Sequence, residues 1–256
     1  MNVSGVSGNS YTNIYSQLSS GKKINTAADG ASEMAIIQKE NTAIGGMDAG
    51  SQNIQSGISA LNIADGALGQ VTDYLQSIKE LSVKASNGLL DKEDRGYIQE
   101  QINQYKQGIA DIVGTAKYNE TSLLSGEKSS LYIATDSDGG NVNVGLGASL
   151  MEQLGIDDYD VSSGNFDMKV IDDAISTVSK MRSGMGAQTN ALTAAYNMNQ
   201  NTSYNLNSAV SSIEDLDIPT AVSEKKKQET LQQYALMMQK KRMEDEKQRA
   251  YRMFDM

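Results

Sequence analysis

The stretch IQSGISALNIADGALGQVTDYLQSI, which runs from Ile54 to Ile78, decides the fold of this chain. Its apolar residues recur at steps of three and four, the spacing that places side chains on one face of an α-helix. They are Ile54, Ile58, Leu61, Ala64, Leu68, Val71, Leu75 and Ile78. The predicted helix runs from about Ala31 to Ser86, far longer than the usual helix of about 11 residues. A helix of this length normally lies against a partner helix, so the stretch predicts a helical rod.

The rest of the chain offers partner helices. Asn87-Gly88 is a typical stop for the first helix, and Asp91 or Asp94 can cap the next one. That helix should end near residues 115–119. Its apolar seam is Ile98, Ile102, Tyr105, Ile109 and Ile112. Helical spacing returns at Ile171, Ile175, Val178, Met181 and Met185, and again at Leu206, Ala209, Ile213 and Leu216. Pro219 interrupts it, because the residue before a proline avoids the helical region, and a last helix is expected from Val222 to about Tyr251.

The period changes in residues 126–166. Leu131, Ile133, Val142, Val144 and Leu146 alternate with polar residues, and the sequence Asp138-Gly139-Gly140-Asn141 lies between the two runs. Glycines there permit the positive φ of a hairpin turn, so we expect a β-hairpin followed by irregular chain. The predicted fold class is mainly α, a long antiparallel helical bundle or coiled-coil rod with a small β-hairpin region. The predicted segments are 1–30, 31–125, 126–166, 167–218 and 219–256.

Composition narrows the function classes. The chain has no cysteine and no histidine. Thiolate metal sites and cysteine nucleophiles are therefore excluded, and the commonest general base and transition-metal ligand is missing. The loop from Asp136 departs from a calcium-binding loop, because Gly140 and Gly147 stand at its fifth and twelfth positions. We expect neither an enzyme nor a cofactor.

Macromolecular partners other than proteins are also not expected. The basic runs at 225–227 and 240–242 lack interleaved aromatic residues, and three acidic residues follow the second run, which argues against nucleic acid. No run reaches the roughly 20 apolar residues that span a membrane. The stretch Met1–Ser20 lacks the apolar region of a secretory signal peptide.

Three collinear blocks resemble bacterial flagellins. The first is LSSGKKINTAADGASEMAI (Leu18–Ile36), the second is LQSIKELSVKASNG (Leu75–Gly88), and the third is AISTVSKMRSGMGAQTNAL (Ala174–Leu192), followed by SSIEDLD (Ser211–Asp217). The resemblance implies a structural subunit that polymerises into the flagellar filament outside the cell and serves motility. It also implies export without a cleaved signal peptide, with an export chaperone and cap and junction proteins as further partners.

The resemblance assigns roles to two groups of residues at the chain ends. One group joins the terminal domain to the rod and contributes to subunit packing: Leu18, Ser19, Ser20, Gly21, Ile24, Asn25 and Asp29. The residues themselves predict a helix break here, because serine and glycine are poor inside helices. The other group, in the last helix, is implied as a binding surface for the export chaperone: Leu231, Tyr234 and Met238.

A further group corresponds to the segment of immunostimulatory flagellins that faces a host receptor. It comprises Ser77, Lys79, Glu80, Leu81 and Gln101. Ser77 and Lys79 stand where the family has arginines, and Gln101 stands where it has glutamate. A serine cannot make the forked, charged contacts of arginine, so weak receptor activation is expected.

The chain departs from the family near both ends. Only 17 residues precede Leu18, and SSIEDLD lacks the family's two arginines in that block. The charged stretch Lys240–Met256 replaces the usual closing stretch rich in Ala, Gln and Leu, and charges inside a filament cost desolvation unless they are paired. Two alternatives therefore remain: a secreted homologue that binds or signals without polymerising, and a hook–filament junction protein. The sequence Asn-Thr-Ala-Ala-Asp at Asn25–Asp29 resembles flagellin more than a hook–filament junction protein.

Overall fold

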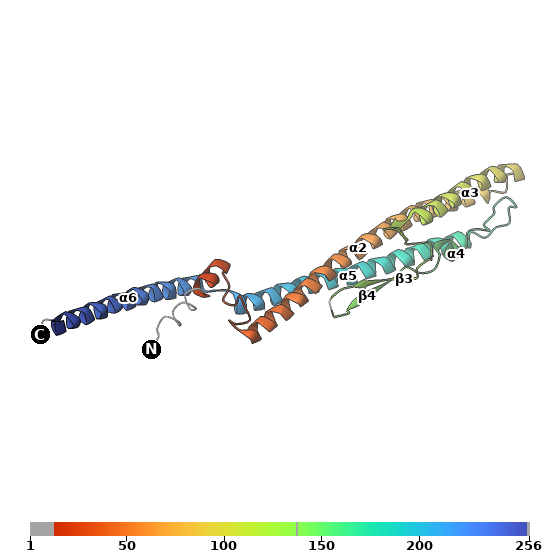
Figure 1. Ribbon diagram of the computed structural model, residues 1–256. Coiled ribbons are helices and arrows are strands. Elements are labelled where there is room, and N and C mark those ends of the chain that lie inside the picture. Colours follow the sequence, from red (N-terminus) through yellow and green to blue (C-terminus); the bar gives the residue numbers. More distant parts are fainter. Residues whose placement is uncertain (1–12, 137, 255–256) are drawn as a thin grey trace. The chain divides into compact units, whose positions relative to one another are not determined.

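The computed structural model describes residues 13–136 and 138–254. Most of this chain is helical, and a first helical segment covers residues 13–20. The helices that follow are α2 (Ala31–Ala85), α3 (Lys92–Thr115), α4 (Leu150–Leu154), α5 (Lys169–Glu214) and α6 (Ile218–Phe254) (Figure 1). Two antiparallel strand pairs complete the fold, β1 (Lys117–Tyr118) with β2 (Thr121–Ser122) and β3 (Ser130–Ala134) with β4 (Asn141–Gly145). The mainly α class with long helices is confirmed.

The chain divides into two compact units, which we describe separately. The central unit comprises residues 43–203, and the terminal unit comprises residues 1–42 and 204–256. Both boundaries fall inside helices, so α2 and α5 each contribute to both units. None of the helices in the described ranges is both long and apolar enough to cross a lipid bilayer.

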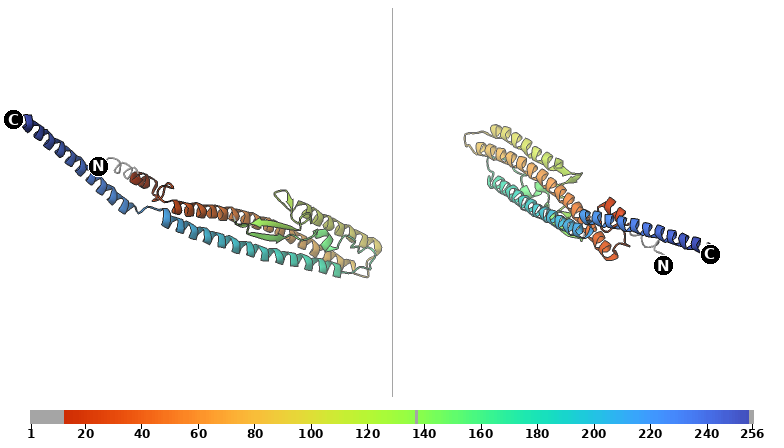
Figure 2. Two further views of the ribbon diagram at one scale, coloured as in Figure 1. Left: turned by 60° about the horizontal axis from the view of Figure 1, so that its bottom comes forward. Right: turned by 90° about the vertical axis from the view of Figure 1, so that its left-hand side faces the viewer.

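In the central unit, α2 and α5 lie side by side and antiparallel (Figures 1 and 2). Two ion pairs fix this direction, because Asp65 of α2 pairs with Arg182 and the later Lys79 pairs with the earlier Asp172. The predicted stripe lies in the core between the helices: Ile58 is half-buried, and the other seven residues are buried. Burial of an apolar side chain contributes about 1.5–3 kcal/mol, so this stripe is one large source of stability in the central unit.

Helix α3 folds back on α2. Ile102, Ile109 and Val113 are buried, and the rings of Tyr74 and Tyr105 lie 5.5 Å apart between centroids. The Asp91 carboxylate caps the helix by accepting the N–H of Asp94 at 2.8 Å, and the Asp94 carboxylate accepts the N–H of Asp91 at 3.4 Å.

The end of α2 differs from the expected glycine stop. Gly88 does not take a positive φ, and α2 ends at Ala85. The guanidinium of Arg95 donates to the carbonyls of Ala85 at 3.1 Å and Asn87 at 3.4 Å. A side chain from the next helix therefore satisfies carbonyl groups that the end of a helix leaves without partners.

The β3–β4 hairpin is confirmed in the predicted place. Leu131 pairs with Val144, and Ile133 pairs with Val142. In its turn, the Asp136 carboxylate accepts the N–H groups of Asp138 and Gly140, at 2.9 and 2.8 Å. The acidic loop that superficially resembles a calcium site thus uses its first carboxylate to hold the turn.

Two short elements were not predicted. The β1–β2 pair turns at Asn119 and Glu120, whose φ angles of 44° and 63° lie in the left-handed region. Helix α4 lies within the stretch predicted to be irregular and buries Leu150 and Leu154; Gly155, which caps its C-terminal end, has a φ of 60°. Helix α4 buries its leucines, whereas the β1–β2 pair only half-buries Tyr118. Neither element has a helical or strand period long enough to be recognised in the sequence.

Two details of the C-terminal helices correct the prediction. Ala209 is exposed, whereas Val210 is 7% exposed and takes the buried position. Helix α6 begins at Ile218 rather than Val222, because proline is tolerated in the first turn of a helix, where its missing N–H has no intrahelical partner. The interruption therefore lies before Pro219, at residues 215–217.

Candidate functional site

The terminal unit contains a junction where two helix breaks meet. The first segment ends at Ser20, and Gly21 has a φ of 70°. The Lys23 N–H donates to the Glu214 carbonyl at 2.6 Å, and the Leu216 N–H donates to the Gly21 carbonyl at 3.0 Å. These bonds make a short antiparallel bridge, so the break after Ser20 and the break after Glu214 are parts of one joint.

A salt bridge supports the joint. Lys22 Nζ lies 2.6 Å from Glu214 Oε1. Glu214 belongs to the block SSIEDLD, and the structure gives it a lysine partner in the N-terminal loop. Such a partly exposed pair contributes at most about 1 kcal/mol, so the main-chain bonds carry most of the connection.

Asp29 organises the loop that follows. One carboxylate oxygen accepts the N–H of Thr26 at 2.9 Å, the N–H of Asn25 at 3.1 Å and the Thr26 hydroxyl at 3.0 Å. The other oxygen accepts the Asn13 side-chain amide at 3.0 Å. These bonds, led by the Thr26 N–H, lower the pKa of Asp29. The carboxylate therefore ties the loop to the first helical segment while remaining ionised.

The seven residues assigned to subunit packing are brought together at this joint. Ile24 is 3% exposed and anchors the loop, and Leu18 and Asn25 are half-buried. Ser19 and Ser20 are exposed, and the Ser20 hydroxyl accepts the Lys22 N–H at 3.2 Å. The structure thus gives most of these residues a role in shaping the joint itself.

The residues assigned to a host receptor are not presented together. Leu81 is 9% exposed and belongs to the core. Lys79 is paired with Asp172 at 2.6 Å, and the Ser77 hydroxyl donates to the Asp73 carbonyl of its own helix at 3.0 Å. Glu80 and Gln101 are exposed. Of the five side chains, only these last two are both exposed and without an ion pair among the described residues.

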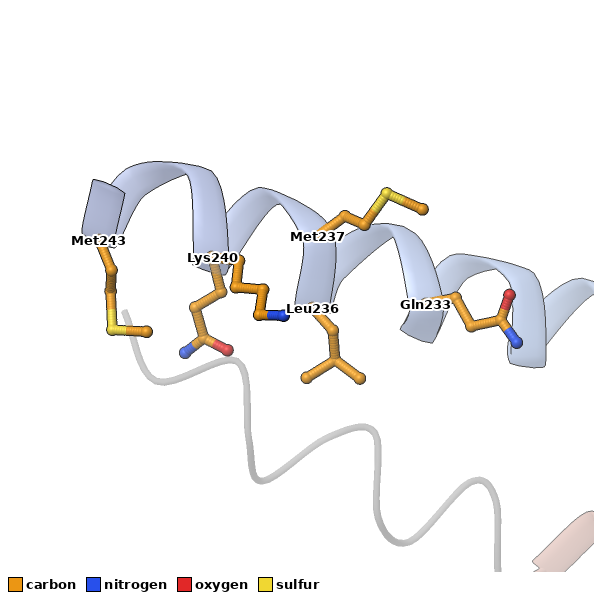
Figure 3. A pocket seen from close by; sticks show the side chains of 6 residues that line it. Gln233, Leu236, Met237, Lys240 and Met243 are labelled. Carbon is orange, nitrogen blue, oxygen red and sulfur yellow. The ribbon is translucent and has the colours of Figure 1, made fainter. Parts of the chain in front are cut away.

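Helix α6 exposes apolar side chains along its length. Leu231, Tyr234 and Met238 are 59%, 63% and 42% exposed. Figure 3 shows Leu236, Lys240 and Met243 on one side of the helix, with Met237 on another. A pocket of about 540 Å³ is lined by Gln233, Leu236, Met237, Gln239, Lys240 and Met243.

The hairpin packs against the face of α2 that carries Gly50 and Gly57, which we call the hairpin seat. The sequence analysis did not predict this contact. On α2, a side chain at Gly50 would collide with the main-chain carbonyl of Thr135, and one at Gly57 would meet the end of Ile133. Asn199, which is 7% exposed, donates to the Thr135 carbonyl at 2.6 Å. Two glycines seven residues apart on one face of a long helix were the available signal, since glycine there permits another backbone to approach closely.

The described side chains offer no metal centre. Within residues 13–136 and 138–254, no three acidic side chains are grouped so that they could hold a metal ion. The perturbed carboxylates at Asp29 and Asp65 are explained by hydrogen bonds from Thr26 and Arg182, which lower their pKa values. The chemistry of these sites is structural.

Comparison with known proteins decides the family. Residues 5–129 match the bacterial flagellin N-terminal helical region, and residues 168–245 match the bacterial flagellin C-terminal helical region. The chain is also 30% identical, over 242 residues, to the flagellar filament 30.7 kDa core protein of Treponema maltophilum, covering 87% of this chain and 85% of that protein. This chain belongs to the bacterial flagellin family. The hairpin and α4 of this flagellin lie between its two family regions.

Solved structures share the fold. The crystal structure of Bacillus cereus flagellin aligns with a TM-score of 0.52 and 23% identity, covering 57% of this chain and 88% of that one. A putative flagellar hook-associated protein from Vibrio parahaemolyticus aligns with a TM-score of 0.57 and 13% identity, covering 73% and 98%. At these identities the likeness concerns the fold alone, and flagellin and hook-associated protein share it.

Proposed function

We propose that this flagellin is a structural subunit that polymerises into the extracellular filament of the bacterial flagellum. Membership of the flagellin family at both ends of the chain is the observation that carries the proposal. Copies of one chain that join head to tail through non-closing contacts form open helical polymers. Main-chain bonds that hold the N- and C-terminal portions together within the terminal unit suit this kind of assembly.

The joint in the terminal unit supports the proposal. The main-chain bonds between residues 21–23 and 214–216 couple the two ends of the chain in one geometry. Asp29 fixes the loop beside them. In a polymer, such a joint presents the same surface on each copy, which repeated contacts require.

Helix α6 supports it in a second way. Its exposed residues include Leu231, Tyr234, Leu236 and Met237, each more than half exposed. Apolar side chains grouped on a surface are typical of interaction sites. Packing against neighbouring copies would remove them from water, and the charged residues at 240–249 would then need partners of opposite sign.

Self-assembly of the purified full-length protein tests this function. We expect a concentration-dependent pellet in sedimentation and filaments in electron micrographs. Leu231→Glu should prevent both, because it places a charge in the contact, whereas Glu224→Gln on the same helix serves as a solvent-facing control. A wild-type protein that stays monomeric at high concentration with added filament seeds would refute the proposal.

The proposed role as a filament subunit also has consequences for export and for chemistry. We propose that the chain leaves the cell without cleavage of a signal peptide, that it needs no cofactor and that it is not an enzyme. Mass spectrometry of the secreted protein should find the N-terminal residues present. Secreted protein that begins well inside the first 20 residues would contradict the export route.

The export chaperone is the proposed partner of Leu231, Tyr234 and Met238. Their exposure makes them accessible before assembly, and apolar side chains on a helix suit a hydrophobic groove. A pull-down with the full chain should recover a flagellar chaperone, and Tyr234→Glu should lose it. Cap and junction proteins are proposed partners at the ends of the polymer.

For the five residues assigned to a host receptor, we propose that the protein activates that receptor only weakly. They are Ser77, Lys79, Glu80, Leu81 and Gln101. Burial of Leu81 and the pairing of Lys79 with Asp172 leave few groups for a receptor to contact. A reporter-cell assay should show low potency. Full potency at low concentration would contradict this reading.

A hook–filament junction protein is the second candidate, because a hook-associated protein shares this fold. Such a protein would add in small number at one end and would not elongate. The sedimentation experiment separates the two functions, because only a filament subunit forms long polymers. A secreted homologue that binds or signals without polymerising would stay monomeric there.

A further inference from the structure

The connection between α2 and α3 contains a dipeptide with its own chemistry. Asn87-Gly88 is the only Asn-Gly pair in the sequence. Both residues are exposed, and they lie outside the helices. A side chain added at Gly88 would meet no heavy atom within 4 Å. The space beside the Gly88 Cα is therefore open.

The hydrogen bonds of this turn use the main-chain N–H groups of Asn87, Leu89 and Leu90 but not that of Gly88. The Asn87 N–H donates to the Lys84 carbonyl, and the Leu90 N–H donates to the Asn87 carbonyl, at 3.1 and 3.2 Å. The Leu89 N–H donates to Asn87 Oδ1 at 3.1 Å. Among the hydrogen bonds of the described residues, none uses the Gly88 N–H. This nitrogen is the one adjacent to the Asn87 side chain.

Arg95 acts on the same peptide group. Its guanidinium donates to the Asn87 carbonyl at 3.4 Å, and that carbonyl shares a peptide bond with the Gly88 nitrogen. The guanidinium is held in place by a second hydrogen bond, which it donates to the Ala85 carbonyl at 3.1 Å. A cation hydrogen-bonded to a carbonyl oxygen stabilises the negative charge that appears there when the adjoining nitrogen loses its proton. Arg95 therefore favours the nucleophilic form of the Gly88 nitrogen.

We propose that Asn87 is a self-modification site, at which the Gly88 nitrogen converts the asparagine to aspartate and isoaspartate. Water or hydroxide removes the Gly88 proton, and the nitrogen forms a bond to Asn87 Cγ. The side-chain amide leaves as ammonia after it takes a proton from water, which closes a succinimide ring. One water molecule then opens the ring at either carbonyl. The reaction consumes one water, releases one ammonia and needs no oxidant or reductant.

Other exposed asparagines lack this combination. Asn119 and Asn165 are also exposed and outside helices, but Glu120 and Phe166 follow them. Their side chains crowd the nitrogen that would have to attack. These two positions are internal controls within the same molecule.

Modification would change the end of α2 in two ways. A carboxylate at position 87 places negative charge near the C-terminal end of a helix, where the helix dipole disfavours it. Isoaspartate adds one carbon to the main chain and moves the carbonyl that Arg95 holds. The modified chain thus has an altered α2–α3 connection beside an Arg95 whose bond must rearrange.

Peptide mass spectrometry of the folded full-length chain during incubation tests the proposal. We expect the Asn87 peptide to accumulate both products, faster at mildly alkaline than at neutral pH, and ahead of the peptides with Asn119 and Asn165. Gly88→Ala, which fits without steric contact, should lose most of the reaction. Arg95→Lys should slow it about tenfold, which corresponds to about 1.4 kcal/mol on the barrier.

Denaturation in urea separates the contribution of the fold from that of the dipeptide. The folded chain should react faster than the unfolded chain, and Arg95→Lys should abolish the difference. Reaction at Asn87 no faster than at Asn165, or an undiminished rate in Gly88→Ala, would overturn the proposal. A folded rate at or below the unfolded rate would overturn the role of Arg95.

Discussion

Gly50→Ala should separate the hairpin from the rod. The new methyl group would collide with the Thr135 carbonyl, a main-chain atom that cannot move away alone. The nearby carbonyls of Thr135 and Ala134 accept hydrogen bonds from Asn199 and Asn53. A shift of the hairpin that relieves the collision would therefore break or stretch both bonds.

The expected cost follows from these contacts. Two hydrogen bonds contribute about 1 kcal/mol each, and partial exposure of Ile133 adds about 1–2 kcal/mol. Alanine is better than glycine inside a helix, which offsets about 1 kcal/mol. The net loss in the free energy of unfolding should be about 2–3 kcal/mol.

Two other glycines of α2 serve as matched controls. A methyl group at Gly45 meets no heavy atom within 4 Å, so Gly45→Ala should stabilise the protein by about 0.5–1 kcal/mol. Gly57→Ala should fall between the two, because it meets the movable end of the Ile133 side chain.

Urea unfolding followed by circular dichroism measures all three variants, and amide hydrogen exchange of β3 and β4 locates the effect. We expect the fastest exchange in the hairpin of Gly50→Ala, a smaller increase in Gly57→Ala and no change in Gly45→Ala. A Gly50→Ala protein as stable as Gly45→Ala, with unchanged exchange in β3 and β4, would refute the reasoning about the hairpin seat.

Three further experiments test other contacts. Asp29→Asn should destabilise the terminal unit at neutral pH: hydrogen bonds lower the pKa of Asp29 in the folded state, so its contribution is present above the unfolded pKa and is lost as pH falls through the folded pKa. Thermal unfolding against pH should show the two proteins converging in acid, and an equal loss at every pH would contradict this. Asp91→Ala should cost about 1 kcal/mol by removing the cap of α3, with faster amide exchange in its first turn; unchanged exchange would count against the capping box. A double-mutant cycle on Asp65 and Arg182, 43% and 42% exposed, should give a coupling of about 0.2–1 kcal/mol that shrinks with added salt; a coupling independent of salt would argue against a surface ion pair.

Elements with a long period were predictable from the sequence. The stripe from Ile54 to Ile78 repeats often enough to specify a helix and its buried face, and the alternation around residues 138–141 specified the hairpin. Ala209 was assigned to the core in place of Val210, because alanine is small enough to occur on either face and two apolar residues stood side by side. The β1–β2 pair was missed because its turn uses Asn119 and Glu120 rather than glycine.

The candidate site was predictable only in part. Serine and glycine at positions 19–21 indicated the helix break, which the structure places at Gly21. The partner of that break, at residues 214–216, is nearly two hundred residues away, and one sequence carries no signal for such a pairing. One of the four bonds of Asp29 likewise comes from a residue outside the loop, Asn13, whereas the other three are local bonds from Asn25 and Thr26.

The most direct test of the central claim expresses this chain in a flagellated bacterium from which its own flagellin genes have been deleted. Electron microscopy of the cell surface and immunogold labelling of the protein then report where it goes. We predict labelled filaments extending from the hooks. Bare hooks with the intact protein free in the medium would contradict the account.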